Sequence, residues 1–462
     1  MTRIVIIGGG PAGYESALVA AQLGATVTVV DSDGIGGSCV LTDCVPSKTL
    51  IATSDRVTAF RDAPRVGVGT VAGEVAVDLT SVHDRIKKLA QQQSADIAAR
   101  LVHERVTVLP GRGRFAASQP ARAHRVEVVD AAGAVADTIE ADVVLLATGG
   151  TPRVLETAEP DGERILSWRQ VYDLTELPEH LVVIGSGVTG AEFASGYSEL
   201  GVPVTLVSSR DRVLPGEDPD AAEVIEQVFT SRGGTLVKRA RASAVKRVGD
   251  GVVVELQDGR TVEGSHALMC VGSVPNSSDL GLEHVGIRPD ERGYIPVDRV
   301  SRTSVPSVYA AGDCTGVLLL ASVAGMQGRI AMWHALGEAV TPLRLKTVAA
   351  NIFTHPEIAT VGLISEQVPG RTVTLPLATN ARAKMQGHRD GFVKLYCRPA
   401  TGVVIGGVVV APNASELIFP VALAVQRGLS VADLAGTIGV YPSLSGSVAE
   451  AARRLMLHDD LD

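Results

Sequence analysis

The first residues that could do chemistry are two cysteines in the segment GGSCVLTDCVPSK, where Cys39 and Cys44 are separated by four residues. In an ideal helix, residues with this spacing have Cα atoms roughly 8 to 9 Å apart, too far for a disulfide, so a bridge requires a distorted turn. A metal site needs two to four ligands close together, and no other cysteine or histidine clusters here, so we predict no metal. The spacing alone leaves two interpretations open, a redox pair and two packed cysteines.

A glycine-rich motif precedes the cysteines and is typical of dinucleotide binding. A short β-branched run is followed by three spaced glycines that open an apolar helical pattern, namely Gly8, Gly10 and Gly13. Such glycines permit a tight turn, a close approach of the backbone to a pyrophosphate and close helix–strand packing, while the helix N-terminus faces the phosphates. Asp31 ends the next strand, where a carboxylate accepts hydrogen bonds from ribose hydroxyls.

The same pattern occurs again in LVVIGSGVTGAEFASGYSELGVPVTLVS, with the glycines Gly185, Gly187 and Gly190. Here Ser208 occupies the place of the acidic residue, and Arg210 follows it. A missing carboxylate with arginine beside it suits the 2′-phosphate of NADP. We therefore favour NADPH over NADH, with Asp211 and the loop geometry leaving NADH open.

The elements that must position these residues belong to two βαβ units, each with two parallel strands and a right-handed crossover. Elsewhere we expect buried strands with glycine turns at 143–150, 266–276 and 307–316, a helix over 80–102, a strand at 403–412 and a helix over 414–428. The sequence thus predicts an α/β fold with two Rossmann-like domains and a separate third domain from about Lys346.

Composition excludes several classes of function. The chain has 462 residues, 45% of them hydrophobic and 20% charged, which is a globular composition. Aromatics are only 3% and the formal net charge is −9, so neither the base-stacking nor the basic surface of a nucleic-acid-binding protein is expected. No apolar run is long enough to predict a membrane span, and the five sparse cysteines argue against a secreted disulfide scaffold. We therefore expect a cytoplasmic protein.

Taken together, the motifs resemble the flavoprotein disulfide reductases, the group of lipoamide dehydrogenase, glutathione reductase and soluble transhydrogenase. The resemblance rests on GGSCVLTDCVPSK, ATGG, GSVPN, AAGDC and FTHPEIATVG, which occur in the family's order along essentially the whole chain. It implies an FAD-binding domain at 1–150 and 277–345, an NAD(P)-binding domain at 151–276, and an α+β interface domain at 346–462 that forms a homodimer.

The resemblance also implies roles for single residues. Cys39 and Cys44 match the family's redox cysteines, Lys48 matches a lysine near the flavin, Glu192 matches the glutamate that pairs with it, and Asp313 matches an aspartate on the FAD ribityl chain. The implied cofactor-binding positions are Gly8, Gly10, Pro11, Ala12, Gly13, Asp31, Ser38, Cys39, Lys48, Gly113, Ala147, Thr148, Gly149, Asp313, Ala321, Gly185, Ser186, Gly187, Val188, Thr189, Gly190, Ser208, Arg210 and Gly272.

Two departures from the family pattern bear on activity. Disulfide-reducing members end with a motif resembling HPTxSE, but this chain has Tyr441 and Gly446 at the positions of the proton-accepting histidine and its orienting glutamate. Tyrosine has an ordinary pKa near 10, against about 6.5 for histidine, so losing the histidine base should remove about 10²–10⁴-fold of the rate. Asp43 adds a carboxylate beside Cys44, which disfavours a thiolate there.

We therefore predict an FAD-dependent NAD(P)H:quinone oxidoreductase with ping-pong electron transfer, in which NAD(P)H reduces the flavin and a quinone then takes the electrons. The resemblance is closest to the lipoamide dehydrogenase-like NAD(P)H:quinone reductases of actinobacteria. Three alternatives stay open: a disulfide reductase whose base is relocated to His355 or His458, a soluble transhydrogenase, and a flavin-bearing binding subunit.

Overall fold

The computed structural model describes residues 1–69, 75–120, 122–363 and 370–456. It divides into two compact units. Unit 1 comprises Met1–Ser47, His83–Arg153 and Gly272–Arg344, and unit 2 comprises Lys48–Val82, Val154–Val271 and Leu345–Asp462. The domain boundaries expected from the sequence divide the chain more finely and stay a prediction.

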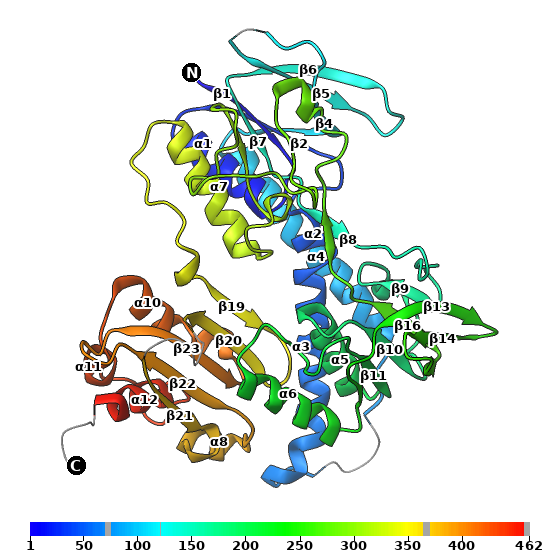
Figure 1. Cartoon of the computed structure of the whole chain (residues 1–462), viewed down its shortest axis with the longest axis vertical. Coiled ribbons are helices and arrows are strands. Elements are labelled where there is room, and N and C mark those ends of the chain that lie inside the picture. The colour runs from blue at the N-terminus through cyan, green and yellow to red at the C-terminus, as the bar shows by residue number, and fades with distance from the viewer. Residues whose placement is uncertain (70–74, 121, 364–369, 457–462) are drawn as a thin grey trace. The chain divides into compact units, whose positions relative to one another are not determined.

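Unit 1 is built on a parallel sheet with strand order β18-β7-β1-β2-β3. The strands are β1 (Arg3–Ile7), β2 (Thr26–Asp31), β3 (Thr107–Pro110), β7 (Val143–Leu146) and β18 (Val308–Ala310). Strands β1 and β7 are almost wholly buried because both faces of the sheet are covered, which is why they are continuous runs of Val, Ile and Leu. The helices α1 (Pro11–Gln22) and α7 (Ala321–Ala335) pack against each other on one face (Figure 1).

The other face of this sheet packs against an antiparallel sheet of β4 (Arg112–Phe115), β5 (His124–Val129) and β6 (Val135–Ala141). A two-stranded ribbon pairs β8 (Gly150–Pro152) with β17 (Ser273–Pro275). Helix α2 (Gly37–Leu41) and most of α4 (Leu79–His103) belong to unit 1, whereas α3 (Cys44–Asp62) lies in unit 2 from Lys48 onward. Helix α4 confirms the helix expected over 80–102.

Unit 2 contains a second parallel sheet, with strand order β12-β11-β10-β16-β9. Its strands are β9 (Ile165–Ser167), β10 (Leu181–Ile184), β11 (Val204–Val207), β12 (Thr235–Val237) and β16 (His266–Met269). Helices α5 (Val188–Leu200) and α6 (Pro219–Ser231) follow β10 and β11, and an antiparallel sheet is formed by β13 (Ala242–Val248), β14 (Gly251–Leu256) and β15 (Thr261–Gly264). Because β1 pairs with β2 and β10 with β11 in parallel, both predicted βαβ units are confirmed.

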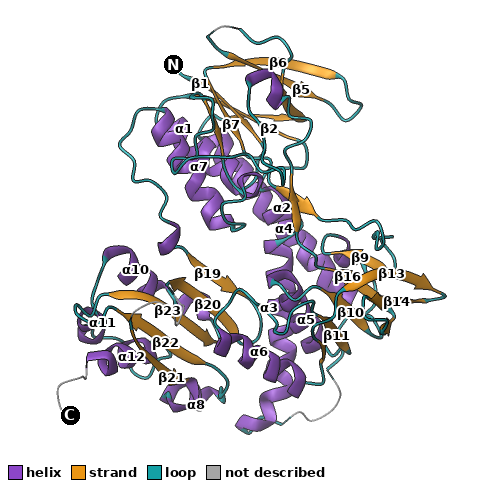
Figure 2. Ribbon diagram, in the orientation of Figure 1, coloured by secondary structure: helices purple, strands orange, loops and turns teal. Residues whose placement is uncertain are grey.

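The C-terminal part of unit 2 is an antiparallel sheet flanked by helices (Figure 2). Its strand order is β19-β20-β23-β22-β21, and the strands are β19 (Ala349–Ile352), β20 (Glu357–Gly362), β21 (Arg371–Pro376), β22 (Phe392–Cys397) and β23 (Val404–Ala411). Its helices are α8 (Ala381–Gln386), α9 (Ala414–Leu417), α10 (Phe419–Arg427), α11 (Val431–Gly436) and α12 (Gly446–Met456).

The single helix expected over 414–428 is therefore wrong, because the structure has two helices there. Pro420 lies in the first turn of α10 and has no N–H with which to continue the hydrogen bonding of α9. As for membrane association, within the part of the chain that the structure describes no helix is both long and apolar enough to cross a bilayer.

A buried ion cluster joins the C-terminal sheet of unit 2 to α6. The Nζ of Lys394 in β22 donates to both oxygens of Asp218, at 2.9 and 2.8 Å, and to Asp220 at 2.6 Å. Asp218 also caps α6 by accepting from the backbone N–H of Asp220 and of Ala221. Lys394 is 5% exposed and Asp218 is 3% exposed, so this cation is paired almost completely out of water. Two segments far apart in sequence are thereby held together.

Candidate functional site: dinucleotide loops and a lysine–glutamate pair

The first glycine loop joins β1 to α1 in unit 1. A Cβ on Gly8 would collide with the carbonyl of Ala147, and a Cβ on Gly13 would collide with the carbonyl of Gly8. Backbone atoms fill the space at both positions, so neither tolerates a side chain. Helix α1 begins at Pro11 with Gly10 as its N-cap, and its first N–H groups face the loop. A tight turn at Gly8 and close packing of the helix at Gly13 are what a dinucleotide-binding loop requires.

Asp31 at the end of β2 is held by backbone donors. Its Oδ2 accepts from the N–H of Gly9 at 2.6 Å, and its Oδ1 accepts from Asp33 at 2.9 Å and Gly34 at 2.5 Å. A carboxylate oxygen can accept two hydrogen bonds, so Oδ2 still has capacity for a ribose hydroxyl. The residue predicted to bind ribose therefore also ties the glycine loop to the turn after β2.

The two cysteines of the motif do not lie on one continuous helix. Cys39 is in α2 and Cys44 is the first residue of α3. The N–H groups of Thr42 and Asp43 both donate to the carbonyl of Ser38, at 2.9 and 2.7 Å, which closes α2 before α3 begins. This is the kind of distorted turn that a bridge between the two would need. The other three cysteines are buried, as small apolar side chains are: Cys270, Cys314 and Cys397.

Further residues of the implied FAD set lie after β7 and β18 at the same edge of the unit 1 sheet. Ala147, Thr148 and Gly149 follow β7, where the Thr148 hydroxyl donates to the carbonyl of Asn276 at 2.6 Å and the Asn276 amide donates back at 2.9 Å. Asp313 follows β18, and burial together with the carboxylate of Asp43 raises its pKa to about 6.

The carboxyl ends of β1, β2, β7 and β18 thus carry Gly8, Asp31, Ala147 and the residues before Asp313, which is where ligands bind to parallel sheets. Two predicted positions lie elsewhere in unit 1. Gly113 is in β4, where a Cβ would press on Ile7, and Ala321 is the first residue of α7.

The second glycine loop, in unit 2, repeats this geometry between β10 and α5. A Cβ on Gly185 would collide with the carbonyl of Cys270, and one on Gly190 with the carbonyl of Gly185. Helix α5 begins with Val188 and Thr189 after the N-cap Gly187. Gly272, which was predicted to belong with this set, falls in unit 1.

Ser208, at the end of β11, is fully buried, and its hydroxyl lies 2.6 Å from that of Ser186. The same hydroxyl accepts from the N–H of Arg210 at 3.1 Å. Ser208 therefore braces the second loop and aligns the backbone of Arg210, whose side chain is exposed.

Lys48 and Glu192 form the pair that the sequence predicts. Lys48 Nζ donates to Glu192 Oε2 at 2.7 Å, and the two side chains are 27% and 5% exposed. The other oxygen, Oε1, accepts from the N–H of Phe353 at 2.9 Å, and Lys48 Nζ lies 5.1 Å from the centre of the Phe353 ring. All three residues belong to unit 2, whereas Cys39 and Cys44 belong to unit 1. A nearly buried carboxylate with both oxygens occupied holds its lysine in one orientation.

Comparison with known proteins decides the family. The family model of the pyridine nucleotide-disulphide oxidoreductases matches residues 2–328, and the model of their dimerisation domain matches residues 348–452. The chain belongs to the pyridine nucleotide-disulphide oxidoreductases. The family and the fold class predicted from the sequence are confirmed, and the chain is an oxidoreductase of a family that uses FAD and NAD(P)H.

Individual relatives of this oxidoreductase match it over nearly their whole length. It is 60% identical to an NAD(P)H dehydrogenase (quinone) of Mycobacterium tuberculosis, covering 100% of the chain and 95% of the relative. It is 32% identical to a dihydrolipoyl dehydrogenase of Geobacillus stearothermophilus, covering 98% and 95%. The crystal structure of LpdA from Mycobacterium tuberculosis superimposes with a TM-score of 0.95 at 60% identity, covering 99% of the chain and 100% of that structure.

A more distant likeness supports the fold alone. The HOCl-induced flavoprotein disulfide reductase RclA from Escherichia coli superimposes with a TM-score of 0.84 at 24% identity, covering 98% of the chain and 99% of that structure. The overall fold therefore persists where most side chains differ.

The C-terminal motif contains the two residues that replace the histidine and glutamate of the family's disulfide reductases. Tyr441 is 86% exposed and precedes α12, whose first residue is Gly446. Of the two histidines considered as a relocated base, His458 lies outside the described residues. His355 lies between β19 and β20, where its Nδ1 is 3.2 Å from Asp55 Oδ1 and 3.9 Å from Glu199 Oε1. His355 is thus already engaged by two carboxylates.

Two residues of the oxidoreductase were missed by the sequence reasoning. Phe353 contacts Lys48 and Glu192 through its ring and its N–H, and the only signal for it was its place in the motif FTHPEIATVG. Arg239 follows β12, has φ +53, and donates its N–H to the carbonyl of Arg210 at 2.8 Å. The basic run KRAR at 238–241 was its signal.

Proposed function

We propose that this oxidoreductase passes electrons from NADPH through bound FAD to a quinone and does not exchange dithiols. One observation carries the proposal: the Lys48–Glu192 pair is intact at 2.7 Å, whereas Tyr441 and Gly446 stand where disulfide reductases of the family have histidine and glutamate. A quinone needs no thiol base to take electrons. The relative at 60% identity bears the name NAD(P)H dehydrogenase (quinone), which supports the same activity.

The residues of unit 1 fit FAD. The first glycine loop has no room for a Cβ at Gly8 or Gly13, Asp31 has acceptor capacity for a ribose, and Asp313 stands at the same edge of the sheet. FAD, when bound, accepts a hydride from a nicotinamide and releases electrons one or two at a time. The ammonium of Lys48 would stabilise negative charge on its electron-carrying ring, and Glu192 would keep that ammonium in place.

Asp43 supports the argument against thiol chemistry. Its carboxylate is close enough to Asp313 to help raise the pKa of that residue to about 6. The same negative charge stands immediately before Cys44, where it counteracts the helix N-terminus of α3 that would otherwise favour the reactive thiolate. The pair Cys39 and Cys44 is therefore expected to contribute little to turnover.

The test of this function is NADPH oxidation by the purified holoenzyme with three separate acceptors: a naphthoquinone, oxidised lipoamide and an NAD⁺ analogue. We expect quinone turnover at least about 100-fold faster than lipoamide turnover, because the base of the dithiol reaction is missing. Lipoamide turnover at a comparable rate would overturn the proposal in favour of a relocated base. Turnover with the nucleotide analogue alone would indicate a transhydrogenase.

The preference for NADPH rests on two guanidinium groups at the carboxyl edge of the unit 2 sheet. Arg210 follows β11 and Arg239 follows β12, the neighbouring strand, and their backbones are joined by a 2.8 Å hydrogen bond. Both side chains are exposed, and within the described ranges neither guanidinium makes a hydrogen bond or an ion pair. Two uncompensated charges beside the second glycine loop suit a 2′-phosphate, which NADH lacks.

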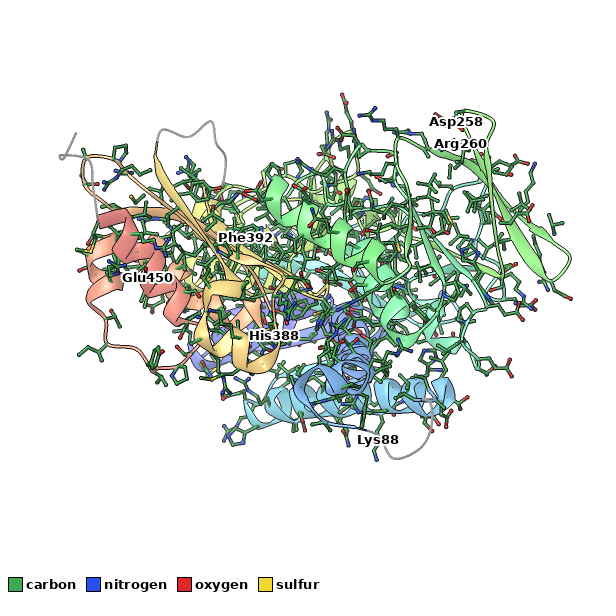
Figure 3. The ribbon with its side chains drawn as sticks, turned by 90° about the horizontal axis from the view of Figure 1, so that it is seen from below. Lys88, Asp258, Arg260, His388, Phe392 and Glu450 are labelled. Atoms are coloured by element: carbon green, nitrogen blue, oxygen red, sulfur yellow. The ribbon has the colours of Figure 1, made fainter. Side chains whose placement is uncertain are left out.

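Replacing Arg239 by alanine is expected to raise the KM for NADPH about ten-fold and to leave the KM for NADH within about two-fold, as loss of one charged hydrogen bond predicts. Calorimetry with 2′,5′-ADP and with 5′-AMP would measure the same difference without turnover. The matched control is Arg260→Ala, at the tip of the β14–β15 hairpin, where Arg260 pairs with Asp258 (Figure 3). Equal losses for both dinucleotides in Arg239→Ala would contradict the assignment.

We also propose that the oxidoreductase is a homodimer formed through residues 348–452, the part matched by the dimerisation model. Large apolar side chains are strongly exposed there: Phe419 is 70% exposed, Val440 is 79% and Tyr441 is 86%. Large exposed apolar side chains are the kind of surface that an interface between subunits would cover. The cytoplasmic location and the absence of a nucleic-acid partner stay predictions from composition.

A further inference from the structure

One face of α5 holds the connection between β19 and β20 at three points. Glu192, Ser195 and Glu199 follow one another at spacings of three and four residues, so they lie on the same face of the helix. Glu192 Oε1 accepts from Phe353 N–H at 2.9 Å and Ser195 Oγ accepts from His355 N–H at 3.1 Å. Glu199 Oε1 lies 3.9 Å from the His355 ring. The segment from Phe353 to His355 is thus fastened along the helix.

Glu192, the first of the three contact residues on α5, also binds Lys48. Glu192 uses one oxygen for Lys48 Nζ, at 2.7 Å, and the other for Phe353 N–H. Lys48 also lies over the Phe353 ring, at 5.1 Å. Any displacement of Phe353 therefore changes both the carboxylate that orients Lys48 and the ring against which its ammonium rests.

Glu199, the last of the three contact residues on α5, belongs to a charged cluster around His355. Its Nδ1 is 3.2 Å from Asp55 Oδ1 of α3, and it faces Glu199, which is 2% exposed. Glu199 is itself held by the Ser54 hydroxyl at 2.9 Å and by Arg232 at 2.6 Å. With His355 protonated, two carboxylates are balanced by two cations. Without that proton, the buried Glu199 carboxylate loses one of its counter-charges and keeps its ion pair with Arg232.

We propose that the charge on His355 is a positioning device for Lys48: it clamps the Phe353–His355 segment to α5 and so fixes the Glu192 carboxylate. His355 is a positioning residue, because it acts on Lys48 through Phe353 and Glu192. The inference rests on the proposed role of Lys48 in electron transfer, but the orientation of Lys48 can be tested by itself.

The positive charge of His355 is lost as pH rises. Burial opposes protonation, but the hydrogen bond to Asp55 and the charge of Glu199 outweigh it, so the pKa of His355 is raised above its ordinary 6.5. The clamp is then complete below the ordinary value and is lost as pH rises through the raised one. The charged and titratable groups that act on this histidine are Asp55 of α3, Glu199 of α5, Arg232 after α6 and His388 after α8, and around them Arg61 contacts Glu199 and Glu357 of β20 interacts with Asp55.

The experiment is competitive acetylation of lysines in the full-length holoenzyme, read by mass spectrometry. The measured quantity is labelling of Lys48 relative to Lys238, an ion-paired lysine of the same unit that bonds Glu226 at 2.6 Å. In the wild type the ratio is expected to rise about five-fold between about pH 6 and pH 9, as the clamp is released. General loosening of the protein would raise both lysines together and leave the ratio unchanged.

Three variants separate the possibilities. His355→Gln is expected to show the high ratio at both pH values, and His355→Arg, whose charge does not titrate, the low ratio at both. Asp55→Asn removes an exposed partner of His355 and is expected to move the step to lower pH without disturbing the fold. A wild-type ratio that does not change with pH, or a His355→Gln ratio equal to that of the wild type at low pH, would overturn the proposal. If the labelling ratio changes with pH as expected but the enzyme does not turn over a quinone, the proposed function is wrong and the positioning role of His355 stands.

Discussion

Replacing Lys48 with methionine is expected to lower the rate at which NADPH bleaches the flavin by about 100-fold, with little change in the KM for NADPH. The expected size follows from losing one preorganised charge that stabilises the reduced state, since a single such group contributes roughly 10²–10³-fold. Methionine keeps the length and packing of the side chain. The measurement is stopped-flow absorbance of the holoenzyme mixed with NADPH, followed by steady-state turnover with a quinone.

The control for this substitution is Lys88→Met, which removes an exposed lysine from α4 (Figure 3). It is expected to leave both rates within two-fold of the wild type, as a typical surface substitution does. Glu192→Gln should fall in between, at about ten-fold, because Lys48 remains but loses its charged support at 2.7 Å. A Lys48→Met protein that reduces its flavin at the wild-type rate would contradict a role for this ammonium.

The second large effect is on stability. Lys394→Met is expected to lower the free energy of unfolding by about 3 to 5 kcal/mol, because it leaves Asp218 buried without its cation. Burial opposes the lysine charge, but the hydrogen bonds to Asp218 and Asp220 outweigh it and raise the pKa of Lys394. Its contribution is therefore fully present below the ordinary lysine pKa of about 10.5 and is lost only as pH rises above it.

Urea unfolding followed by circular dichroism would measure this loss at neutral pH. The matched control is Lys246→Met, which breaks an ion pair with Glu255 of the same short length, 2.6 Å, but with both side chains about half exposed. An exposed pair is worth less than about 1 kcal/mol, so the two variants should differ clearly. Equal small losses would mean that water reaches Asp218 as readily as it reaches Glu255.

Secondary structure and motifs that depend on nearby residues could be predicted from the sequence. Contacts between side chains far apart in the sequence could not. Both βαβ units follow from β-branched runs and glycine spacing, which act within about 30 residues. The pairing of Lys48 with Glu192 was expected only from the family resemblance. Nothing local indicates that Phe353 bonds Glu192, since 161 residues separate them, or that Lys394 meets Asp218 across 176. Such contacts are decided by tertiary packing.

Some local features were also misjudged for physical reasons. The apolar pattern over 414–428 predicts one helix, but Pro420 starts a new one, because a missing N–H outweighs hydrophobic periodicity. Ser208 stays a predicted cofactor-binding position; its side chain is buried against Ser186, while Arg239 on the next strand has an exposed side chain that the sequence analysis did not single out. The sequence pattern predicts which residue follows each strand. It does not predict which strands are neighbours in the sheet, and therefore which residues lie side by side at its edge.

Helix α5 spans 13 residues, which is about 20 Å. Its first turn belongs to the nucleotide loop, and its last two turns hold a segment of the dimerisation domain. A helix of this length moves as a stiff rod, so an occupied loop at one end cannot shift it without straining the contacts at the other. In the proposed dimer, this would couple each proposed nucleotide loop to the dimerisation domain of the same subunit. Cooperativity between the two sites, seen as a Hill coefficient for NADPH different from one, would be its signature.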